Sequence, residues 1–554
     1  MPRRPGPARA ARPAPRAWLR PADLGNVTPG EESPEPGRPA GASRPGAGAG
    51  GGAQTRAGAP ISVASEASTT TTPRRAPRRP TAPQWKLADL TLEDRIARGK
   101  AARRDAPRSA HGRWEPPAGR PDPVSLLQEQ AASRVPELVP IRYGRMLVSP
   151  GTFYRGGALI MASDLARSPR SGITVQLCGD AHLSNFGVFG SPERQLIFDI
   201  NDFDETLPGP WEWDVRRLAA SFEVAGRDLG FSAADRRAIV LAAARSYREE
   251  LRAAAGMRTL DAWYAHLNVD VITRQIDVAV REQRLGKKEA REARRDLAKA
   301  RTRDSVRVLA RRAGKVDGEL RIVRDAPLVT PLEDLVLSPQ ARAATEQSVR
   351  RLIGTYRRSL AHDHHPIEEF HYVHMARKVV GVGSVGTRCW IILMTGRDAD
   401  DPLFLQAKEA QPSVLERFAG ASALRQHGER VVVGQRLMQA ASDIFLGWLR
   451  VTDLDGQPRD YYVRQFHDWK GSAEVATLQV PGATLYARMC GATLARAHAR
   501  WGDRIAMAAY LGPGDVFDRA MADFSAAYAD QNERDYEALA AAVKSGRVPA
   551  ETGL

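Results

Sequence analysis

The sequence predicts an α+β fold in which a strand-rich block lies between two helical regions. Apolar residues recur at helical spacing through much of 92–360, and they do so again in 483–545. Between these regions, short runs of strand-forming residues alternate with Gly and Asp turns. With 554 residues, the chain is long enough for two or three domains and at least one large core.

The first helical region is predicted to contain two short strands among its helices. The strands are 173–177 and 196–200, and a helix with one apolar face is expected at 213–228. In that helix, Val215 and Leu218 alternate with Arg216 and Arg217. The other predicted helices are 92–104, 124–134, 152–167, 232–255, 258–267, 277–313 and 339–360.

The strand-rich block is predicted from about residue 375. Its expected strands are 378–382, 389–395, 402–407, 431–437, 445–451 and 461–465. Two further helices then follow at 483–499 and 516–545.

Residues 1–85 are predicted to be a disordered tail. They are rich in Pro, Ala, Gly, Arg and Ser, so they cannot bury enough apolar surface to offset chain entropy. Residues 1–80 hold 13 arginines against five acids, which accounts for half of the formal net charge of +16. An organelle transit peptide, also rich in Arg, is the alternative that we favour less.

A second share of the basic charge lies in 282–313. A solvated helix face is favoured there over a site for nucleic acid or another anion. The chain has only three Cys residues, which argues for a reducing compartment. No apolar run approaches the roughly 20 residues that span a bilayer, so we expect a cytoplasmic protein without membrane insertion.

Acidic residues follow both predicted strands of the first region. Asp180 leaves the first strand, and Asn185 follows five positions later. Asp199, Asp202 and Asp204 gather at the end of the second strand. Crowded carboxylates repel one another unless they are solvated or bind a cation, and Mg²⁺ favours carboxylate and amide oxygens. Asn185 and the three later acids are therefore candidate metal ligands, although any one acid alone could be a turn or capping residue.

The spacing of these residues matches the phosphoryl-transfer site of protein kinases. There, a catalytic loop has the form Asp-x-x-x-x-Asn, and a later Asp-Phe unit binds metal. Asp180 and Asn185 match the loop, and Asp202 matches the later unit, with Asp204 where protein kinases have Gly. Asp180 would accept the proton of a substrate hydroxyl, and His182 would brace the loop.

The segment Gly179-Asp180-Ala181-His182-Leu183-Ser184-Asn185 resembles the corresponding loop of aminoglycoside phosphotransferases and choline kinases. Trp213-Asp214-Val215 also resembles their pattern. The resemblance implies that Asp214, at the beginning of a helix, braces the catalytic loop.

Residues 381–386 fit the pattern G-x-G-x-x-G, with Gly381, Gly383, Ser384 and Gly386 as candidate phosphate contacts. A dinucleotide-binding fold would need a helix directly after such a loop. The residues that follow, 387–393, are instead rich in strand formers. We therefore favour a strand–loop–strand hairpin that covers nucleotide phosphates, with an ordinary tight hairpin as the alternative.

Lys408 ends the third predicted strand of the block, where it would pair with nucleotide phosphates. Glu416 is a weaker candidate for its acidic partner. The glycine-rich loop and Lys408 follow Asp180 by about 200 residues, whereas in protein kinases they precede the catalytic Asp. A circularly permuted arrangement would explain this order, because site geometry depends on position in space and not on chain order.

Several blocks resemble the bacterial domain-of-unknown-function family 2252, over roughly 95–540. They are Tyr143-Gly144-Arg145-Met146, Ser149-Pro150, Phe153-Tyr154-Arg155-Gly156, Cys178-Gly179-Asp180-Ala181-His182, Asn201-Asp202-Phe203-Asp204-Glu205, Gly381–Arg388, Lys408-Glu409-Ala410 and Ala495–Arg500. The resemblance implies a protein-kinase-like fold, but it implies no established substrate.

These observations predict a two-lobed, apparently circularly permuted kinase-like fold with helical additions. The expected parts are the tail 1–85, a helical catalytic lobe 86–370, a nucleotide-binding lobe 371–475 and C-terminal helices 476–554. The expected activity is phosphotransfer from ATP or another nucleoside triphosphate, with Mg²⁺, to a hydroxyl of an unknown small molecule or protein. Arg155 is a further candidate for the site, since Arg suits phosphate, with a packing role as the equal alternative.

Three alternatives stay open. The chain could be a non-catalytic nucleotide-binding or scaffold module with a basic surface for an anionic partner. The same site could transfer a nucleotidyl group. Metal-dependent hydrolysis is a weaker alternative, because it leaves the glycine-rich loop unexplained. The sequence does not reveal the acceptor or the oligomeric state.

Overall fold

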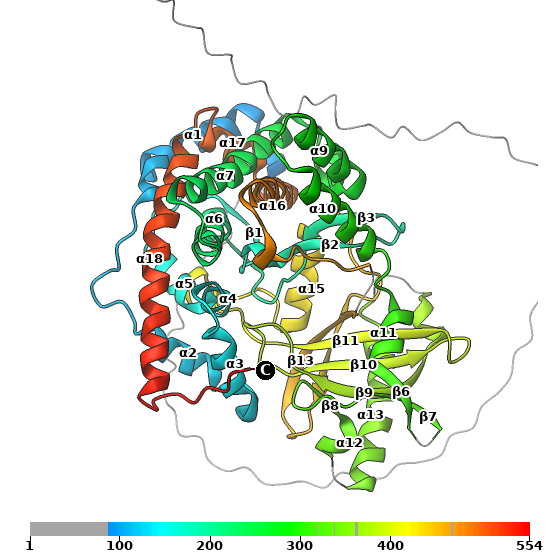
Figure 1. Cartoon of the computed structure of the whole chain (residues 1–554). Helices are drawn as coiled ribbons and strands as arrows, with labels where there is room; N and C mark the ends of the chain where they lie inside the picture. The colour runs from blue at the N-terminus through cyan, green and yellow to red at the C-terminus, as the bar shows by residue number, and fades with distance from the viewer. Residues whose placement is uncertain (1–86, 317, 337, 361–363, 467–468, 554) are drawn as a thin grey trace, which may run out of the picture. The chain divides into compact units, whose positions relative to one another are not determined.

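A computed structural model describes residues 87–553, except 317, 337, 361–363 and 467–468. The predicted tail 1–85 lies outside the described residues. Residues Pro80–Leu554 form one compact unit. It is a mixed α+β structure, mostly helical and with antiparallel sheets, which confirms the predicted class (Figure 1).

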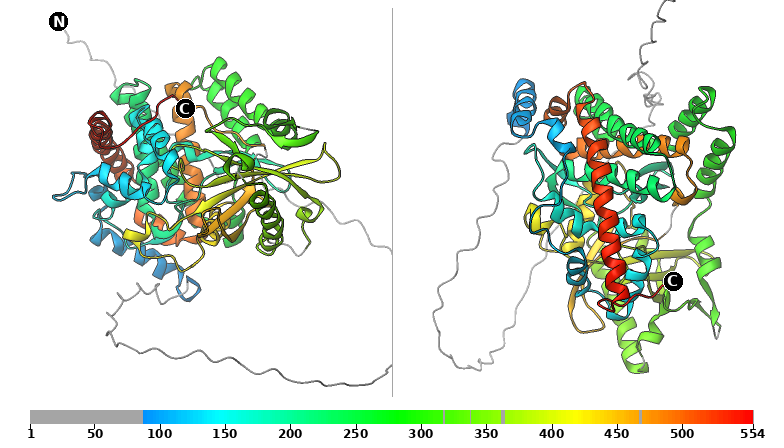
Figure 2. Two further views of the ribbon diagram at one scale, coloured as in Figure 1. Left: turned by 90° about the horizontal axis from the view of Figure 1, so that it is seen from below. Right: turned by 60° about the vertical axis from the view of Figure 1, so that its left-hand side comes forward.

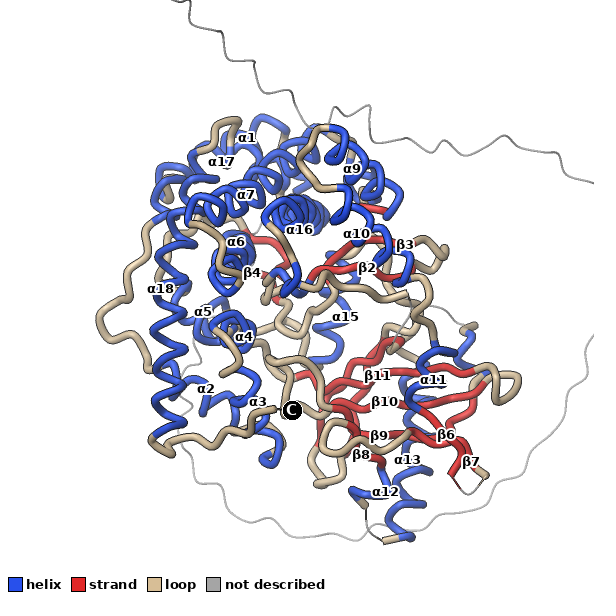
Figure 3. Tube along the Cα trace, in the orientation of Figure 1, coloured by secondary structure: helices blue, strands red, loops and turns tan. Residues whose placement is uncertain are grey.

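The helical part of the unit consists of residues 87–300 and 480–553, so its two pieces are far apart in the chain (Figure 3). Its first helices are α1 (Leu92–Asp105), α2 (Pro123–Ala131), α3 (Val139–Met146), α4 (Pro150–Gly156) and α5 (Ala158–Leu165). Further helices are α6 (Trp211–Asp228), α7 (Ala233–Gly256), α8 (Thr259–Tyr264), α9 (Val269–Arg281), α10 (Lys287–Ala300), α16 (Val480–Trp501), α17 (Arg504–Leu511) and α18 (Val516–Lys544).

Two small sheets lie among these helices. β1 (Thr174–Leu177) pairs with β4 (Leu207–Pro210), while β2 (Phe186–Gly190) and β5 (Leu267–Asn268) flank β3 (Leu196–Ile200). The candidate acids leave β1 and β3, as the sequence predicted.

The strand-rich part consists of residues 305–479, and a six-stranded antiparallel sheet forms its centre (Figure 2). The spatial order of the strands is β12-β13-β11-β10-β9-β8. Their bounds are β8 (Val329–Pro331), β9 (His371–Lys378), β10 (Cys389–Thr395), β11 (Pro402–Ala410), β12 (Gly447–Thr452) and β13 (Pro458–Gln465). The other elements are α11 (Ser305–Arg312), β6 (Ala313–Val316), β7 (Glu319–Ile322), α12 (Leu332–Leu335), α13 (Pro339–Arg357), α14 (Glu416–Ala419) and α15 (His427–Met438).

Both faces of the six-stranded sheet are covered. Trp390 and Leu405 point to one face, where they pack with Tyr356 of α13. Ile391 and Phe404 point to the other, where they pack with Val308 of α11. Because successive residues of a strand alternate between faces, Lys408 lies on the same face as Phe404.

The predicted strand 431–437 is wrong, because these residues belong to α15. Three consecutive valines, 431–433, favour a strand, yet Val431 and Val432 are buried in the same core as α16 and β1. Packing therefore outweighs the weak intrinsic preference of β-branched residues. The predicted strand 378–382 is also misplaced, since β9 ends at Lys378.

The predicted long helix 277–313 is divided into α9, α10 and α11. Gly286 lies before the first residue of α10, and the side chain of Asp304 caps α11 by accepting the backbone N–H of Arg307. Of the basic side chains in this stretch, Arg294, Arg295, Lys299, Arg301 and Arg311 are exposed, and Arg312 is half-buried. None of the helices in the described ranges combines the length and apolar character that crossing a bilayer requires.

Candidate active site

The loop that carries Asp180 is fixed by a buried carboxylate. Asp214, in the first turn of α6, accepts the backbone N–H groups of Cys178 (2.8 Å) and Gly179 (3.0 Å). Gly179 has φ +86°, and an added Cβ there would collide with the carbonyl of Glu205. The bracing role predicted for Asp214 is therefore confirmed.

Asp214 is itself held in place by two other helices. Nε2 of His498, in α16, lies 3.2 Å from its carboxylate, and the hydroxyl of Tyr247, in α7, lies 2.8 Å from Nδ1 of His498. His498 and Asp214 are buried. The position of Asp180 thus depends on a polar chain that runs through the core of the helical part.

The carboxylate of Asp180 is paired with Arg217 of α6. Nε and NH2 of Arg217 each lie 2.8 Å from Oδ1 of Asp180, and the guanidinium lies over the ring of Tyr154. Burial would lower the pKa of Arg217, but the charge and hydrogen bond of Asp180, together with the nearby tyrosines, outweigh burial and raise that pKa. Arg217 was predicted on the polar face of an amphipathic helix, yet it is buried.

His182 and Asn185 close the loop. Nε2 of His182 lies 3.6 Å from Oδ2 of Asp180, and burial lowers the pKa of this histidine to about 4, so it is neutral at pH 7. The amide nitrogen of Asn185 donates to the carbonyl of Asp180 (2.6 Å). Its amide oxygen is left as the polar atom that could bind a cation.

Lys408 lies against two of the acids that follow β3, Asp202 and Asp204. Its ammonium contacts the carboxylate of Asp204 and lies 3.7 Å from the carboxylate of Asp202. Asp202 and Asp204 precede Lys408 in the chain by 206 and 204 positions. Tyr462 donates its hydroxyl to the other oxygen of Asp204 (2.8 Å). Burial would raise the pKa of Asp202, but the charges of Lys408 and Arg464 outweigh it and hold that pKa at about 2.

Asp199 lies apart from this group. It is buried on β3, where its side chain accepts the backbone N–H groups of Ile200 (2.9 Å) and Ala440 (3.4 Å). It does not line the cavity described below. Glu416, the predicted partner of Lys408, instead accepts the backbone N–H of Ser413.

The glycine-rich loop joins β9 to β10, so it is the strand–loop–strand hairpin that the sequence favoured. Ser384 donates its hydroxyl to Asp204 (3.3 Å). An added Cβ on Gly383 would lie 3.2 Å from the carbonyl of Arg155. Gly381 and Gly386 have φ +63° and +89°. The loop therefore lies directly against the acids and Arg155.

Residues of the helical part fasten this loop. The backbone N–H of Val135 donates to the carbonyl of Gly386 (2.8 Å), and Arg134 donates to the carbonyl of Val385. Arg145 donates to the carbonyl of Gly381 (2.7 Å). These contacts fix the loop at both ends.

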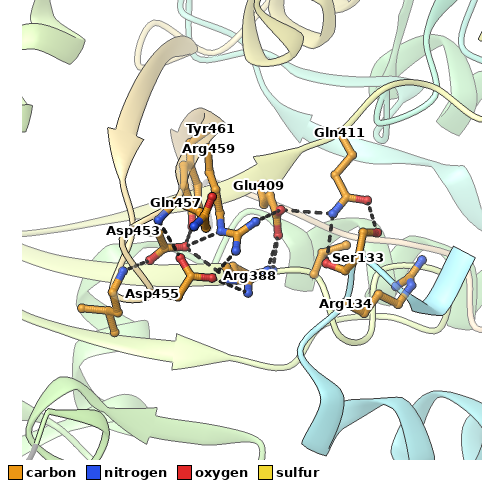
Figure 4. A network of polar contacts seen from close by, with 12 residues as sticks. Ser133, Arg134, Arg388, Glu409, Gln411, Asp453, Asp455, Gln457, Arg459 and Tyr461 are labelled. Atoms are coloured by element: carbon orange, nitrogen blue, oxygen red, sulfur yellow. Dashed lines mark hydrogen bonds and ion pairs between the residues drawn. The ribbon is translucent and has the colours of Figure 1, made fainter.

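An ion network joins Glu409 of β11 to Arg388 and to residues of the turn between β12 and β13 (Figure 4). Arg388 and Arg459 each lie 3.3 Å from Asp453, and both also contact Asp455 and Glu409. The network satisfies the charge of Glu409, the residue after Lys408, so that carboxylate does not compete for the lysine.

The two parts of the unit enclose a cavity of about 800 Å³. Asp180, Asn185, Asp202 and Asp204 line it from the helical part, and the loop 381–384 lines it from the strand-rich part. Most of the predicted site residues thus line the cavity, whereas Lys408, Gly386 and Asp199 do not.

Arg155 also lines the cavity, and its buried Nε has no hydrogen-bond partner among the described residues. Burial lowers its pKa, although the charges of Asp180 and Asp202 oppose this. Glu205 lines the cavity too and accepts the backbone N–H of Val414 (2.7 Å). Sequence reasoning had not singled out Glu205, whose only signal was its place in the acidic run.

The family model that matches this chain covers residues 134–542 and describes an uncharacterised protein conserved in bacteria (DUF2252). The chain belongs to this family. No curated protein and no solved structure matched the chain. The DUF2252 segment contains the candidate acids, the glycine-rich loop and Lys408, whereas Glu129, Gln130 and Ser133, which also line the cavity, precede the matched residues.

Proposed function

We propose that this DUF2252 protein is an ATP- and Mg²⁺-dependent phosphotransferase with a kinase-like, circularly permuted two-lobed fold. The observation that carries the proposal is the contact of Lys408 with Asp202 and Asp204 beside a cavity that Asp180 also lines. In the proposal, the helical part is the catalytic lobe, and the strand-rich part binds the nucleotide.

The donor set suits a magnesium ion shared with phosphates. Asp202 and Asn185 would hold the ion, with Asp204 as a second carboxylate. Within the described ranges, no three His, Cys, Asp or Glu side chains form a ligand cluster. A Mg²⁺ ion of this kind needs only one or two protein carboxylates, because water and phosphate oxygens complete its shell. When bound, it would supply positive charge to the phosphates.

The residues around the cavity have complementary roles in the proposed reaction. The oxygen of the acceptor hydroxyl forms a bond to the γ-phosphorus, while the bond from that phosphorus to its bridging oxygen breaks and ADP leaves with the electron pair. Asp180 accepts the hydroxyl proton, and Arg217 keeps its carboxylate oriented. Lys408 and Arg155 stabilise negative charge on the phosphates.

Nucleotide-dependent thermal stabilisation tests the proposal. A ligand at a hundred times its Kd stabilises a protein by about 2.7 kcal/mol. ATP with Mg²⁺ should raise the Tm of the wild-type chain, and Lys408→Ala and Asp202→Ala should abolish the rise. Lys378→Ala is the matched control, because Lys378 is a half-buried lysine on β9 of the same sheet that does not line the cavity.

The proposal fails if no nucleotide stabilises the wild type, or if both variants keep the full rise. Incubation of the protein with ATP, Mg²⁺ and candidate acceptors separates phosphoryl transfer from nucleotidyl transfer. The product mass increases by a phosphoryl group in the proposed reaction and by a nucleotidyl group in the alternative.

A further inference from the structure

A second cavity, of about 260 Å³, lies next to Asn201 and shares no lining residue with the candidate active site. The turn between β2 and β3 lines one side, and α15 lines another. Arg464 and Gln465 at the end of β13, together with Phe466 and Lys470, complete the described lining. Neither the predicted site residues nor the proposed reaction accounts for this cavity.

Two basic side chains, Arg464 and Lys470, line this cavity, and neither has a carboxylate at ion-pair distance among the described residues, although the charge of Asp202 acts on both. Arg464 donates to the amide oxygen of Gln406 (3.1 Å) and to the carbonyl of Asn201 (2.9 Å), which are both neutral. The charge of Arg464, followed by burial, lowers the pKa of Lys470 to about 7. Asp443, the one carboxylate among the described lining residues, accepts the backbone N–H groups of Phe445 and Gln465.

Unsatisfied neutral groups lie beside the two cations. Nδ2 of Asn201 is buried and has no hydrogen-bond partner, and the same holds for Oε1 of Gln435, within the part of the chain that the structure describes. Both residues line the cavity. Buried polar atoms are nearly always hydrogen-bonded in proteins, so a ligand with both accepting and donating groups would satisfy them.

Strained backbone borders the same cavity. Arg194, in the lining, has φ +58°, and Trp469, next to Lys470, has φ +50°. The guanidinium of Arg194 lies 4.2 Å from the centre of the Trp469 ring. Non-glycine residues at positive φ persist only where the surrounding structure fixes them, and they gather at ligand sites.

We propose that this cavity binds a small molecule bearing a phosphate group. The phosphate lies between Arg464 and Lys470 and accepts a hydrogen bond from Asn201, while Gln435 accepts one from a hydroxyl of the ligand. Two adjacent cations with spare donors suit a tetrahedral oxyanion. The proposal goes beyond the phosphotransfer site and does not depend on it.

Calorimetric titration of the whole chain tests the site. The probes are inorganic phosphate and glycerol phosphate, which separate free phosphate from a phosphomonoester with hydroxyls. Lys470→Met should weaken the binding of either probe at least tenfold. The Lys470→Met variant should fold, because loss of the Lys470 ammonium relieves its repulsion with Arg464. The loss also leaves no described carboxylate without its ion-pair partner.

Lys378→Met controls for the loss of a half-buried lysine, and Lys408→Ala controls for binding in the active-site cavity. Both should keep wild-type affinity for the probes. The proposal is overturned if neither probe binds, if Lys470→Met leaves the affinity unchanged, or if Lys408→Ala abolishes binding. Failure of the phosphotransfer proposal would instead appear as an absent response to ATP with Mg²⁺.

Discussion

At the residue scale, the central feature is a nearly fully buried lysine between two acids. Lys408 is 3% exposed, and its ammonium has Asp202 and Asp204 as its counter-ions. A buried charge is tolerated when it is paired, and removing one partner leaves the other uncompensated. The ion pairs of Lys408 with Asp202 and Asp204 therefore couple the stability of the strand-rich part to that of the helical part.

Lys408→Met should lower the free energy of unfolding by about 2–3 kcal/mol, below the typical value for a fully buried pair because both acids are partly exposed. Adding Asp204→Asn should recover part of this loss, with a coupling energy of about 1–2 kcal/mol. Urea denaturation of the wild type, both single variants and the double variant measures it. Strictly additive losses would show that the two side chains do not interact.

Most of the site residues predicted from the sequence line the cavity, but their partners were not predicted. Asp180, Asn185 and Asp202 stand at fixed spacings within short segments, and such local patterns are visible in the chain. Arg217 and Tyr462 were missed as partners, because they reach Asp180 and Asp204 through tertiary packing that no spacing encodes. Asp199 shares the acidic run, yet it lies on a strand position that packs away from the cavity.

At the element scale, the glycine-rich loop differs from a free turn because the helical part fastens it. Gly386 lies beside Arg134, whose Cβ would be 3.0 Å from a Cβ added to the glycine. Gly381 also has positive φ, but nothing lies within 4 Å of the Cβ position there. The two glycines thus separate the cost of the backbone conformation from the cost of the close contact.

Gly386→Ala should destabilise the protein by about 2 kcal/mol, because it combines an unfavourable φ with a steric contact. Gly381→Ala is the matched control and should cost about 1 kcal/mol, for its φ alone. Chemical denaturation of both variants checks the order. Equal losses would mean that the contact with Arg134 relaxes freely.

The errors in the predicted elements have a common physical origin. The strand predicted at 431–437 failed because burial in a mixed core, and not the β-branched side chains, decides the structure there. The hairpin of β6 and β7 and the strand β8 were missed because each is very short. The long, periodic helices at 213–228 and 516–545 agree closely with α6 and α18.

At the scale of the compact unit, distant segments are joined through buried polar groups. His111, which precedes α2, lies 2.6 Å from the hydroxyl of Tyr510 in α17 and 3.0 Å from NH2 of Arg216 in α6. Burial, with the charge of Arg216, lowers the pKa of His111 to about 3. The folded state therefore requires this histidine to be neutral.

The free energy of unfolding should fall on acidification, because the unfolded chain protonates His111 more readily than the folded chain does. Between the ordinary pKa near 6.5 and the folded value of about 3, the unfolded chain binds the proton and the folded chain does not, so protons favour unfolding. From pH 7 to pH 5, His111 alone should lower the free energy of unfolding by about 2 kcal/mol. The buried His182 adds a loss of the same sign.

Denaturant titrations at pH 7 and pH 5 measure this loss. His111→Gln should flatten the pH dependence between these values, whereas substitution of the exposed His266 by Gln should leave it as in the wild type. A pH dependence that is the same in His111→Gln and the wild type would contradict the assignment.

The long separation in the chain between the segments of the site explains why the whole molecule was harder to predict than its site. The loop 381–386 and Lys408 come after the acids in the chain, yet hydrogen bonds from Ser384 and Lys408 to Asp204 bring the segments together. The order of the segments in the chain does not predict that Ser384 and Lys408 contact Asp204. The contact was expected because a glycine-rich hairpin and an acidic cluster occur in the same chain.

The proposed phosphotransfer function is tested most directly by a crystal structure with Mg²⁺ and a non-hydrolysable ATP analogue. The proposed function predicts triphosphate density between the loop 381–384 and Asp202, with Mg²⁺ bound to Asp202 and the ammonium of Lys408 contacting a phosphate oxygen. A nucleotide bound elsewhere, with Lys408 still contacting Asp204 and no metal at Asp202, would contradict it.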